Sequence, residues 1–503
     1  MEALDILRTG LETEPGHAQG HLLAGISSLH LGRWELGVAH SRAAAAADPG
    51  NAAAWCNLAL GQRELGRNAA ARFAARRAIA VNPGLAKGWI ALGLVDQDGG
   101  ARNEARASFK RALELEPNLA NVYLSLGNLD QLEGSIGAAL ECYRKAQALD
   151  PTIAEVPYSR GHIFHKATGD IGAAIESYRE AIAIRGDYAM AHHNLANALF
   201  LAGDFAQAWS EYRWRPPRLR FEARCNAAGN PYDPPRVVPP AGSRLLVIAE
   251  QGLGDVIFFL RFAPRLRELG VLLEFRGDTR LHGMLSRTGL FERMVPDDED
   301  LRDARNPAVL AGDLPLLLPE DQRSKAVPAL ALTAEPSRIS AARARLANAG
   351  PPPYIGLAWR AGSPKTGPEE ALLKELPLQE LGVGLRGKRA TWISMQRAPR
   401  PGEAETLASS SGATVHDFSS VNEDLEDCLA FMATLDGLVG VSNTNVHLRA
   451  GCGLGGHVLV PFPYEWRWMT TGPSRWFPSI GVYRQAPGGS WSDAFAQLSR
   501  DLG

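Results

Sequence analysis

Paired cysteines, long apolar runs and an excess of either charge are all missing from this sequence of 503 residues. The 5 cysteines are scattered without a Cys-x-x-Cys pair, so we expect neither a disulfide framework nor a thiolate zinc site. Lys plus Arg number 53 and Asp plus Glu 55, a net charge of −2 that excludes a generally basic nucleic-acid-binding protein. No apolar run reaches membrane-spanning length, and the first residues lack the features of a signal peptide. We therefore expect a soluble cytoplasmic protein with reduced thiols, no nucleic-acid partner and no membrane span.

What the sequence does contain is a repeat with a step of 34 residues. The step is marked by Pro15, Pro49, Pro83, Pro117 and Pro151. Alanines late in each unit keep the same step: Ala44, Ala78, Ala112 and Ala146. Large residues early and small residues late in a unit are what two packed helices need, and each proline stands where the second helix must stop. This pattern resembles the tetratricopeptide repeat and predicts an all-α solenoid over residues 1–215, with one residue inserted near Thr168.

A solenoid of this kind leaves a concave face, which is either a groove for a protein partner or a surface for self-association into a homo-oligomer. In O-linked N-acetylglucosamine transferases, which carry these repeats before a catalytic region, a ladder of groove asparagines holds the acceptor backbone. The corresponding positions here are Asn57, Ala91, Ser125, Ser159 and Asn194. The ladder is incomplete, so that binding mode does not carry over as a whole. Asn57 and Asn194 are the candidate acceptor-groove residues.

The second half has a different organisation. Residues 216–242 are rich in proline and arginine without a helical or strand period, which predicts a tether or wrapping arm. Beyond them, short apolar runs alternate with helical stretches, the pattern of parallel βα units covered by helices. The expected strands are Leu245–Ala249, Val271–Phe275, Tyr354–Ala358, Ala390–Ser394, Ala413–Asp417, Gly437–Val441 and His457–Val460. A Gly-Pro break at 350–353 divides them into two doubly wound units, 243–350 and 351–503, with a cleft expected at the carboxyl ends of their strands.

Two turns after predicted strands carry charged residues. In the first, Gly252 and Gly254 permit a tight strand-to-helix turn that also holds Asp255. Asp255 is either a helix N-cap or a general base that projects into the cleft. In the second, Arg360 and Lys365 lie on a Gly/Pro loop, an arrangement that suits a phosphate group. The alternative for Lys365 is ordinary solvation at the surface.

A third turn concentrates hydroxyl and amide groups at the start of a helix. Ser442, Asn443 and Thr444 stand where the helix leaves its first N–H groups without partners, and His447 follows one turn later. Capping explains one of these residues but not all of them together. The turn is therefore a candidate binding site for the phosphate and ribose of a nucleotide.

These three turns, in this order, resemble the bacterial heptosyltransferase family of glycosyltransferases, and in particular its tetratricopeptide-linked members, from Leu245 to the C-terminus. Further matches are the segments 393–396, which contains Gln396, and 465–468 with 476–479. The resemblance implies the two-domain GT-B fold and transfer of a sugar from a nucleotide-sugar donor with inversion, without a metal or another cofactor. It makes Asp255 the base. It also places these residues at the donor: Gly252, Gly254, Arg360, Lys365, Gln396, Ser442, Asn443, Thr444 and His447.

Two features leave alternatives open. The family often has Asp-Thr where this chain has Ser442-Asn443, so the donor is changed or the activity is weakened. Trp466 and Trp468, with Arg467 between them, either stack on the donor or pack the C-terminal segment onto the fold. The run 297–300 has an Asp-x-Asp spelling, but it lies among charges typical of a solvated turn, so no metal is expected.

The sequence thus predicts an all-α tetratricopeptide solenoid followed by an α/β glycosyltransferase of the GT-B fold. The predicted function is inverting, metal-independent glycosyl transfer from a nucleotide sugar to an acceptor, which we expect to be a protein recruited by the repeats. The alternative is a non-catalytic interaction protein that carries a degenerate glycosyltransferase region. No motif specifies the sugar, the nucleotide or the acceptor.

Overall fold

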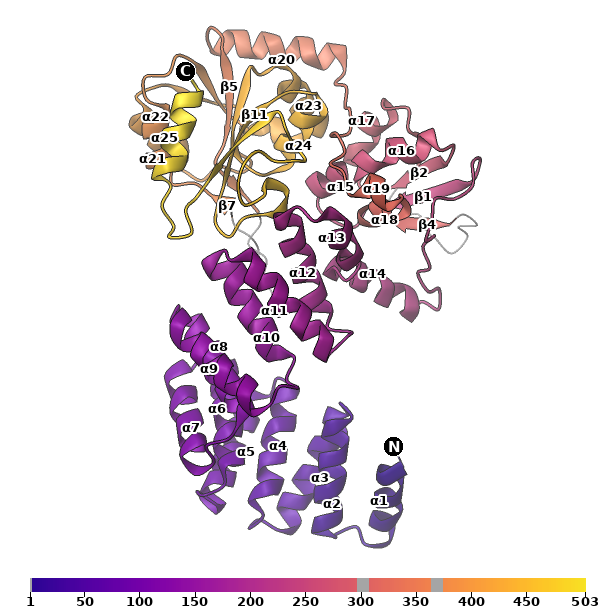
Figure 1. Cartoon of the computed structure of the whole chain (residues 1–503), viewed down its shortest axis with the longest axis vertical. Helices are drawn as coiled ribbons and strands as arrows, with labels where there is room; N and C mark the ends of the chain where they lie inside the picture. Colours follow the sequence, from indigo (N-terminus) through magenta and orange to yellow (C-terminus); the bar gives the residue numbers. More distant parts are fainter. Residues whose placement is uncertain (1, 296–306, 363–373) are drawn as a thin grey trace. The chain divides into compact units, whose positions relative to one another are not determined.

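The computed structural model describes residues 2–295, 307–362 and 374–503 (Figure 1). Lys365 and the acidic run 297–300 lie outside the described residues. The chain forms two compact units, which divide within the helical array and not at its end. The first comprises Met1–Ile163 with Glu180–Gly186, and the second Phe164–Arg179 with Asp187–Gly503.

The first unit is a succession of antiparallel helix pairs. Its helices are α1 (Glu2–Thr13), α2 (Ala18–His30), α3 (Trp34–Ala47), α4 (Ala52–Glu64), α5 (Asn68–Val81), α6 (Ala86–Asp98), α7 (Arg102–Leu115), α8 (Ala120–Leu132), α9 (Ile136–Leu149) and α10 (Glu155–Ile163). Each repeated proline lies in the turn after the second helix of a pair, as the pattern predicts. The four periodic alanines from Ala44 to Ala146 are buried, which lets neighbouring helices approach closely.

Polar contacts between repeats recur with the same step. Asp96 in α6 forms an ion pair with Arg72 in α5 at 2.8 Å, and Asp130 in α8 pairs with Arg106 in α7 at 2.7 Å. Both carboxylates are buried, so each needs its guanidinium partner. The pairs therefore hold the register between successive repeats.

The inserted residue near Thr168 has a structural counterpart. Residues Phe164–Thr168 form a π-helical turn, η1, between α10 and α11 (Ile171–Ile184). A π turn accommodates one extra residue inside a helix without breaking it. The π turn thus coincides with the position of the inserted residue.

The helical part of the second unit continues with α12 (Ala189–Ala202), α13 (Phe205–Tyr212) and α14 (Pro216–Ala227). Helix α14 falls in the segment 216–242, which was expected to be a tether or wrapping arm without regular structure, so the expectation of no helix there is wrong. Two prolines at its start favour helix initiation, because they need no intrahelical N–H partner. None of the residues of α14 is buried, and the helix has no apolar stripe. The sequence therefore lacks the apolar periodicity that would have predicted a helix here. Helix α14 is held by charged contacts, described below, and by Phe221, which packs against buried residues of the first sheet.

Two parallel sheets follow. The first has the order β3-β2-β1-β4 and the second β12-β11-β10-β5-β8-β9. Their strands are β1 (Arg244–Ile248), β2 (Leu272–Arg276), β3 (Phe291–Val295), β4 (Ala308–Leu310), β5 (Tyr354–Ala358), β8 (Thr391–Ser394), β9 (Val415–Asp417), β10 (Gly437–Val441), β11 (Gly456–Val460) and β12 (Ile480–Arg484), while β6 (Arg360–Ala361) and β7 (Lys374–Glu375) form a separate antiparallel pair. Counted from its own first strand, the second sheet has the order 3-2-1-4-5-6 of a doubly wound fold, and the first sheet has its 3-2-1-4 part.

Helices connect the strands and cover the sheets (Figure 1). In the first sheet region they are α15 (Leu253–Phe259), α16 (Ala263–Glu268), α17 (His282–Ser286), α18 (Leu314–Leu317) and α19 (Glu320–Arg323), with the 3-10 turns η2 (Leu260–Phe262), η3 (Thr279–Leu281) and η5 (Ala311–Asp313). The second has α20 (Pro336–Ala349), α21 (Leu378–Leu385), α22 (Glu403–Ser411), α23 (Leu425–Thr434), α24 (Thr444–Gly451) and α25 (Ser492–Asp501), with η6 (Ser419–Glu423) and η7 (Trp466–Trp468). In a doubly wound sheet ligands bind at the carboxyl ends of the strands where the order reverses, between strands 1 and 4. That position is β1/β4 in one sheet and β5/β10 in the other.

Candidate functional site

Asp255 lies in the first turn of α15, directly beyond the carboxyl end of β1. The N-cap of this helix is Gly252, so the side chain of Asp255 is not the cap. Its Oδ1 instead accepts a hydrogen bond from Nη2 of Arg467 at 2.5 Å. With 34% of its side chain exposed, Asp255 remains accessible to a ligand. The structure therefore favours a role in a site over a role in capping.

A chain of alternating charges continues from Asp255. Nη1 of Arg467 donates to Oε1 of Glu465 at 2.7 Å, and Nζ of Lys374 donates to Oε2 of Glu465 at 2.5 Å. Lys374 also donates to the carbonyl of Ser442 at 3.2 Å. Burial raises the pKa of Glu465, but Lys374 and Arg467 lower it more, so the net pKa lies well below its ordinary value. The chain of ion pairs thus links the turn that holds Asp255 to the turn that holds Ser442.

Arg467 has little freedom to move. Only 7% of its side chain is exposed, and its guanidinium carbon lies 4.6 Å from the ring centre of Phe258 and 4.5 Å from that of Trp466. Cation–π contacts of this kind, added to two ion pairs, fix the plane of the guanidinium. Arg467 is therefore a positioning residue for the Asp255 carboxylate.

The Ser442 turn lies at the carboxyl end of β10 and opens α24. Asn443 is the N-cap, its Oδ1 accepting from the N–H of Val446 at 3.2 Å. His447, one turn in, is buried, and a Cβ added to Gly254 would lie 3.0 Å from its Cδ2. Glycine at position 254 leaves room for this close approach of α15 and α24, because a Cβ there would press against His447. The structure thus brings together two of the three turns singled out in the sequence.

The imidazole of His447 is neutral in this setting. Burial, and then the charge of Arg467, lower its pKa well below the ordinary value. Its Nδ1 is buried and forms no hydrogen bond with any residue of the described ranges. A buried polar atom without a partner is uncommon and is a reason to consider a missing ligand.

Two of the candidate donor residues have their polar atoms engaged within the protein. The guanidinium of Arg360 pairs with Glu403 at 3.2 Å. Gln396 is buried, accepts from the N–H of Arg360 at 2.8 Å and donates to its carbonyl at 3.1 Å. These contacts shape the loop after β5. Lys365, on the same loop, belongs to the part of the chain that the structure does not describe.

The two candidate stacking tryptophans are buried. Trp466 stacks on Phe200 of α12 with ring centres 4.3 Å apart, and Trp468 stacks on Phe477 at 5.1 Å. Trp468 is 0% exposed. Their faces are thus occupied by other rings of the protein, which favours packing over stacking on a donor.

The candidate groove asparagines lie in different units. Asn57 is 2% exposed, and its Oδ1 accepts from Nζ of Lys87 in the next repeat at 2.8 Å. Asn194 is 8% exposed on α12 of the second unit. Neither asparagine side chain is open to solvent. The hydrogen bond from Lys87 was not predicted by the comparison with the asparagine ladder of O-linked N-acetylglucosamine transferases.

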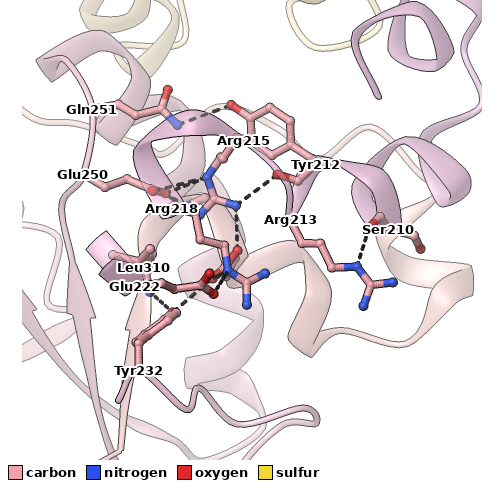
Figure 2. A network of polar contacts seen from close by, with 12 residues as sticks. Ser210, Tyr212, Arg213, Arg215, Arg218, Glu222, Tyr232, Glu250, Gln251 and Leu310 are labelled. Atoms are coloured by element: carbon pink, nitrogen blue, oxygen red, sulfur yellow. Dashed lines mark hydrogen bonds and ion pairs between the residues drawn. The ribbon is translucent and has the colours of Figure 1, made fainter. Parts of the chain in front are cut away.

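A buried charge network joins α13 and α14 to the first sheet (Figure 2). Arg215, with 0% of its side chain exposed, pairs with Glu250 after β1 at 2.6 Å and with Asp313 after β4 at 2.7 Å. Tyr232 donates to Asp313 at 3.0 Å and accepts from the N–H of Leu310 at 2.9 Å. Burial lowers the pKa of Arg215, but Asp313 and Glu250 raise it more, so it stays charged. The end of the repeats is thereby fastened to the two strands that flank the candidate site.

Sequence reasoning missed Glu465, Lys374 and the Arg215 network. Glu465 lies in the matched segment 465–468, where nothing sets it apart from its neighbours, and Lys374 follows a stretch without a recognisable period. Arg215 and Glu250 are separated by 35 residues, and no local pattern links them. Nothing in a single sequence signals such pairs.

The described residues offer neither a membrane span nor a metal site. Within 2–295, 307–362 and 374–503, no helix is long and apolar enough to cross a membrane. In the same ranges no group of three or more His, Cys, Asp and Glu residues has the arrangement of a metal site.

Comparison with known proteins identifies the repeats. A tetratricopeptide-repeat family model matches residues 118–153, and a TPR-repeat model matches residues 166–203. The chain therefore contains tetratricopeptide repeats, a class that serves protein interaction. The repeat prediction is confirmed.

The relatives are distant. The chain is 24% identical over 337 residues to protein FlbA of Caulobacter vibrioides, across 63% of this chain and 55% of FlbA, so the match spans about half of that protein. Solved structures that resemble it include a thermophilic TPR protein of Thermus thermophilus, with 22% identity, a TM-score of 0.33, and coverage of 36% of this chain and 98% of that one. Another is PilF of Pseudomonas aeruginosa, with 19% identity, a TM-score of 0.36, and coverage of 41% and 97%.

Proposed function

We propose that the protein is an inverting glycosyltransferase of the GT-B class, with the repeats recruiting a protein acceptor. The observation that carries the proposal is the meeting of the Asp255 turn with the Ser442 turn. Each follows a strand at the switch point of a doubly wound sheet, where such folds bind ligands. A base from one sheet beside a helix start from the other is the arrangement that glycosyl transfer needs.

In the proposed reaction Oδ2 of Asp255 takes the proton of the acceptor hydroxyl. The acceptor oxygen forms a bond to the anomeric carbon from the side opposite the leaving group, and the bond between that carbon and the diphosphate oxygen breaks. The configuration is inverted and the electron pair leaves with the diphosphate. Arg467 holds Oδ1, at 2.5 Å, so that Oδ2 faces the acceptor.

The leaving diphosphate needs positive charge and hydrogen-bond donors. The free N–H groups at the start of α24, near Ser442 and Thr444, supply donors, and Lys365 supplies charge. The neutral ring of His447 donates one hydrogen bond without adding charge. No cofactor or metal takes part in this scheme. The sugar transferred is a hexose, a heptose or a related residue.

Asp255→Asn tests the proposal. The amide keeps the size of the side chain and an acceptor for Arg467 but is not a base, so transfer should fall by about 10²- to 10⁴-fold while nucleoside diphosphate binding is retained. Asp493→Asn, the same change at an exposed residue in the first turn of α25, is the matched control. Mass spectrometry of cellular proteins should show a sugar-sized mass on an acceptor with the wild type and the control, and not with Asp255→Asn. Calorimetry with a nucleoside diphosphate panel measures binding.

Two outcomes would reject the proposal. If no nucleotide binds and no protein changes mass when the gene is removed, the chain is an interaction protein without catalysis. If Asp255→Asn turns over as fast as the wild type, Asp255 has no part in the chemistry. The first outcome is the alternative that the sequence itself raises, because Ser442-Asn443 stands where the family often has Asp-Thr.

A further inference from the structure

Beside the Asp255 turn lies a cavity of about 640 Å³. Its walls come from four segments of the second unit: α14, the end of β1 with the turn that follows, the end of β2, and η3. Gly252, Leu253 and Val256 of the Asp255 turn line it, and Oδ2 of Asp255 lies 3.6 Å from the point where a Cβ on Gly252 would stand. A volume of this size is typical of a small-molecule site. Oδ2 of Asp255 therefore lies close to Gly252, a residue of the cavity wall.

The charges that line the cavity are mainly positive. Among the described residues they are Arg224, Arg276, Arg280, Glu250 and Asp278. Three guanidinium groups thus face two carboxylates, and the charge of Glu250 is already balanced by Arg215 behind the wall, at 2.6 Å. The cavity has an excess of positive charge at the mouth of the candidate site.

Two of these arginines have donors to spare. Arg280 uses Nε and Nη2 on Asp278, at 2.9 and 2.6 Å, and its Nη1 forms no hydrogen bond with the residues that the structure describes. Arg224 forms no ion pair within the same ranges, and its guanidinium carbon lies 5.7 Å from the ring centre of Phe221, which also lines the cavity. Both arginines are exposed at the wall of the cavity, where a solute can reach them. Guanidinium groups are the side chains that best match phosphate and carboxylate oxygens.

We propose that this cavity binds an anionic group, a phosphate or a carboxylate, through Arg224 and Arg280. Its assignment to the acceptor, next to the hydroxyl that Asp255 deprotonates, rests on the proposed function. Arg224 comes from α14, the helix that follows the repeats. The segment that ends the solenoid thus supplies one wall of the site, and the acceptor is selected by charge as well as by the repeats.

The test measures binding of inorganic phosphate and D-glucuronate to the full chain, with D-glucose as the neutral control. Equilibrium dialysis with labelled ligands gives the affinities, and the ratio of phosphate to glucuronate affinity tells which anion the site prefers. We expect saturable binding of at least one anion and none of glucose. Arg224→Ala and Arg280→Ala should each weaken anion binding by about tenfold. The matched control is Arg213→Ala, an exposed arginine near the start of α14 whose Nε donates to the carbonyl of Ser210 at 2.8 Å.

The inference is wrong if neither anion saturates, if glucose also binds saturably, or if both variants bind the anion like the control. Nucleoside diphosphate affinity, measured on the same samples, should be unchanged in Arg224→Ala, which separates this site from the donor site. If anions bind as expected but Asp255→Asn shows no loss of transfer, the proposed function fails and the anion site stands. If transfer depends on Asp255 but no anion binds, only the anion site fails.

Discussion

The two compact units are stabilised by different chemistry. In the first unit one solution is repeated: small alanines at the helix contacts and an Arg–Asp pair between repeats. In the second, α12 to α14 meet the sheets through contacts that occur once, with stacked aromatic rings and the buried Arg215 network. A repeated contact is added or removed without altering its neighbours, because each repeat contacts only the next one. A contact that occurs once has no substitute.

Truncation should give the largest effect. Deletion of residues 1–217 removes Arg215, which leaves the buried Glu250 without its cation and leaves Asp313 with Arg218, whose Nε lies 3.5 Å from its Oδ2. It also removes Phe200 from Trp466. We expect loss of the cooperative unfolding transition, because these costs together approach the total stability of a domain, about 5–15 kcal/mol. Deletion of residues 1–153 keeps α10 to α14 and should retain the transition in scanning calorimetry. If the two truncated chains are equally stable, the contacts that occur once in the second unit contribute no more to stability than the repeated contacts of the first.

Arg215→Met should have the next largest effect. The change leaves the buried Glu250 without its cation and leaves Asp313 with Arg218 at 3.5 Å, which costs about 3–5 kcal/mol in the free energy of unfolding. Hydrogen exchange followed by mass spectrometry should show the loss in β1, β4 and α14, with no change in α1 to α9. Arg213→Met, on an exposed side chain of the same segment, should stay within about 0.5 kcal/mol of the wild type. A loss spread evenly over both units would show that the network also supports the repeats.

Ala78→Leu should have the smallest effect. Ala78 in α5 is 0% exposed, and its Cβ lies 3.7 Å from the point where a Cβ on Gly88 would stand. Extra carbon atoms at such a contact cost about 1–3 kcal/mol, because the two helices must move apart. Urea unfolding measures the change, with Ala80→Leu on the exposed face of the same helix as the control. A destabilisation as large as that of Arg215→Met would show that the alanine contacts also have no substitute.

The sequence predicted the strands best where both faces are covered. Tyr354–Ala358 and Gly437–Val441 were expected with the bounds that the structure has, because central parallel strands are continuous apolar runs. Strands β3, β4 and β12 were missed. β3 is an edge strand with exposed charged residues, β4 has 3 residues, and β12 is an edge strand with a glycine. Such strands owe their conformation to pairing with a neighbour and not to a local pattern.

The candidate site was predicted in part for the same reason. Turns after strands are visible in a sequence, and two of them, at Asp255 and Ser442, meet as expected. Arg360 and Gln396 match motif positions, yet their polar atoms hold the loop after β5. Lys374 and Glu465 reach the site from loops placed by tertiary contacts, so only the folded chain reveals them.

The contact of Arg215 with both sheet strands also limits how such a chain can change over evolutionary time. Whole repeats are free to be duplicated or lost ahead of η1, because each carries its own contacts, and the array can lengthen to suit a longer partner. Between Arg215 and Glu250 the spacing is constrained, since an insertion that shifted either residue would break the buried ion pair between them. New partner specificities are therefore expected to arise by recombination upstream of Arg215, while the segment from Arg215 to Glu250 is expected to keep its length.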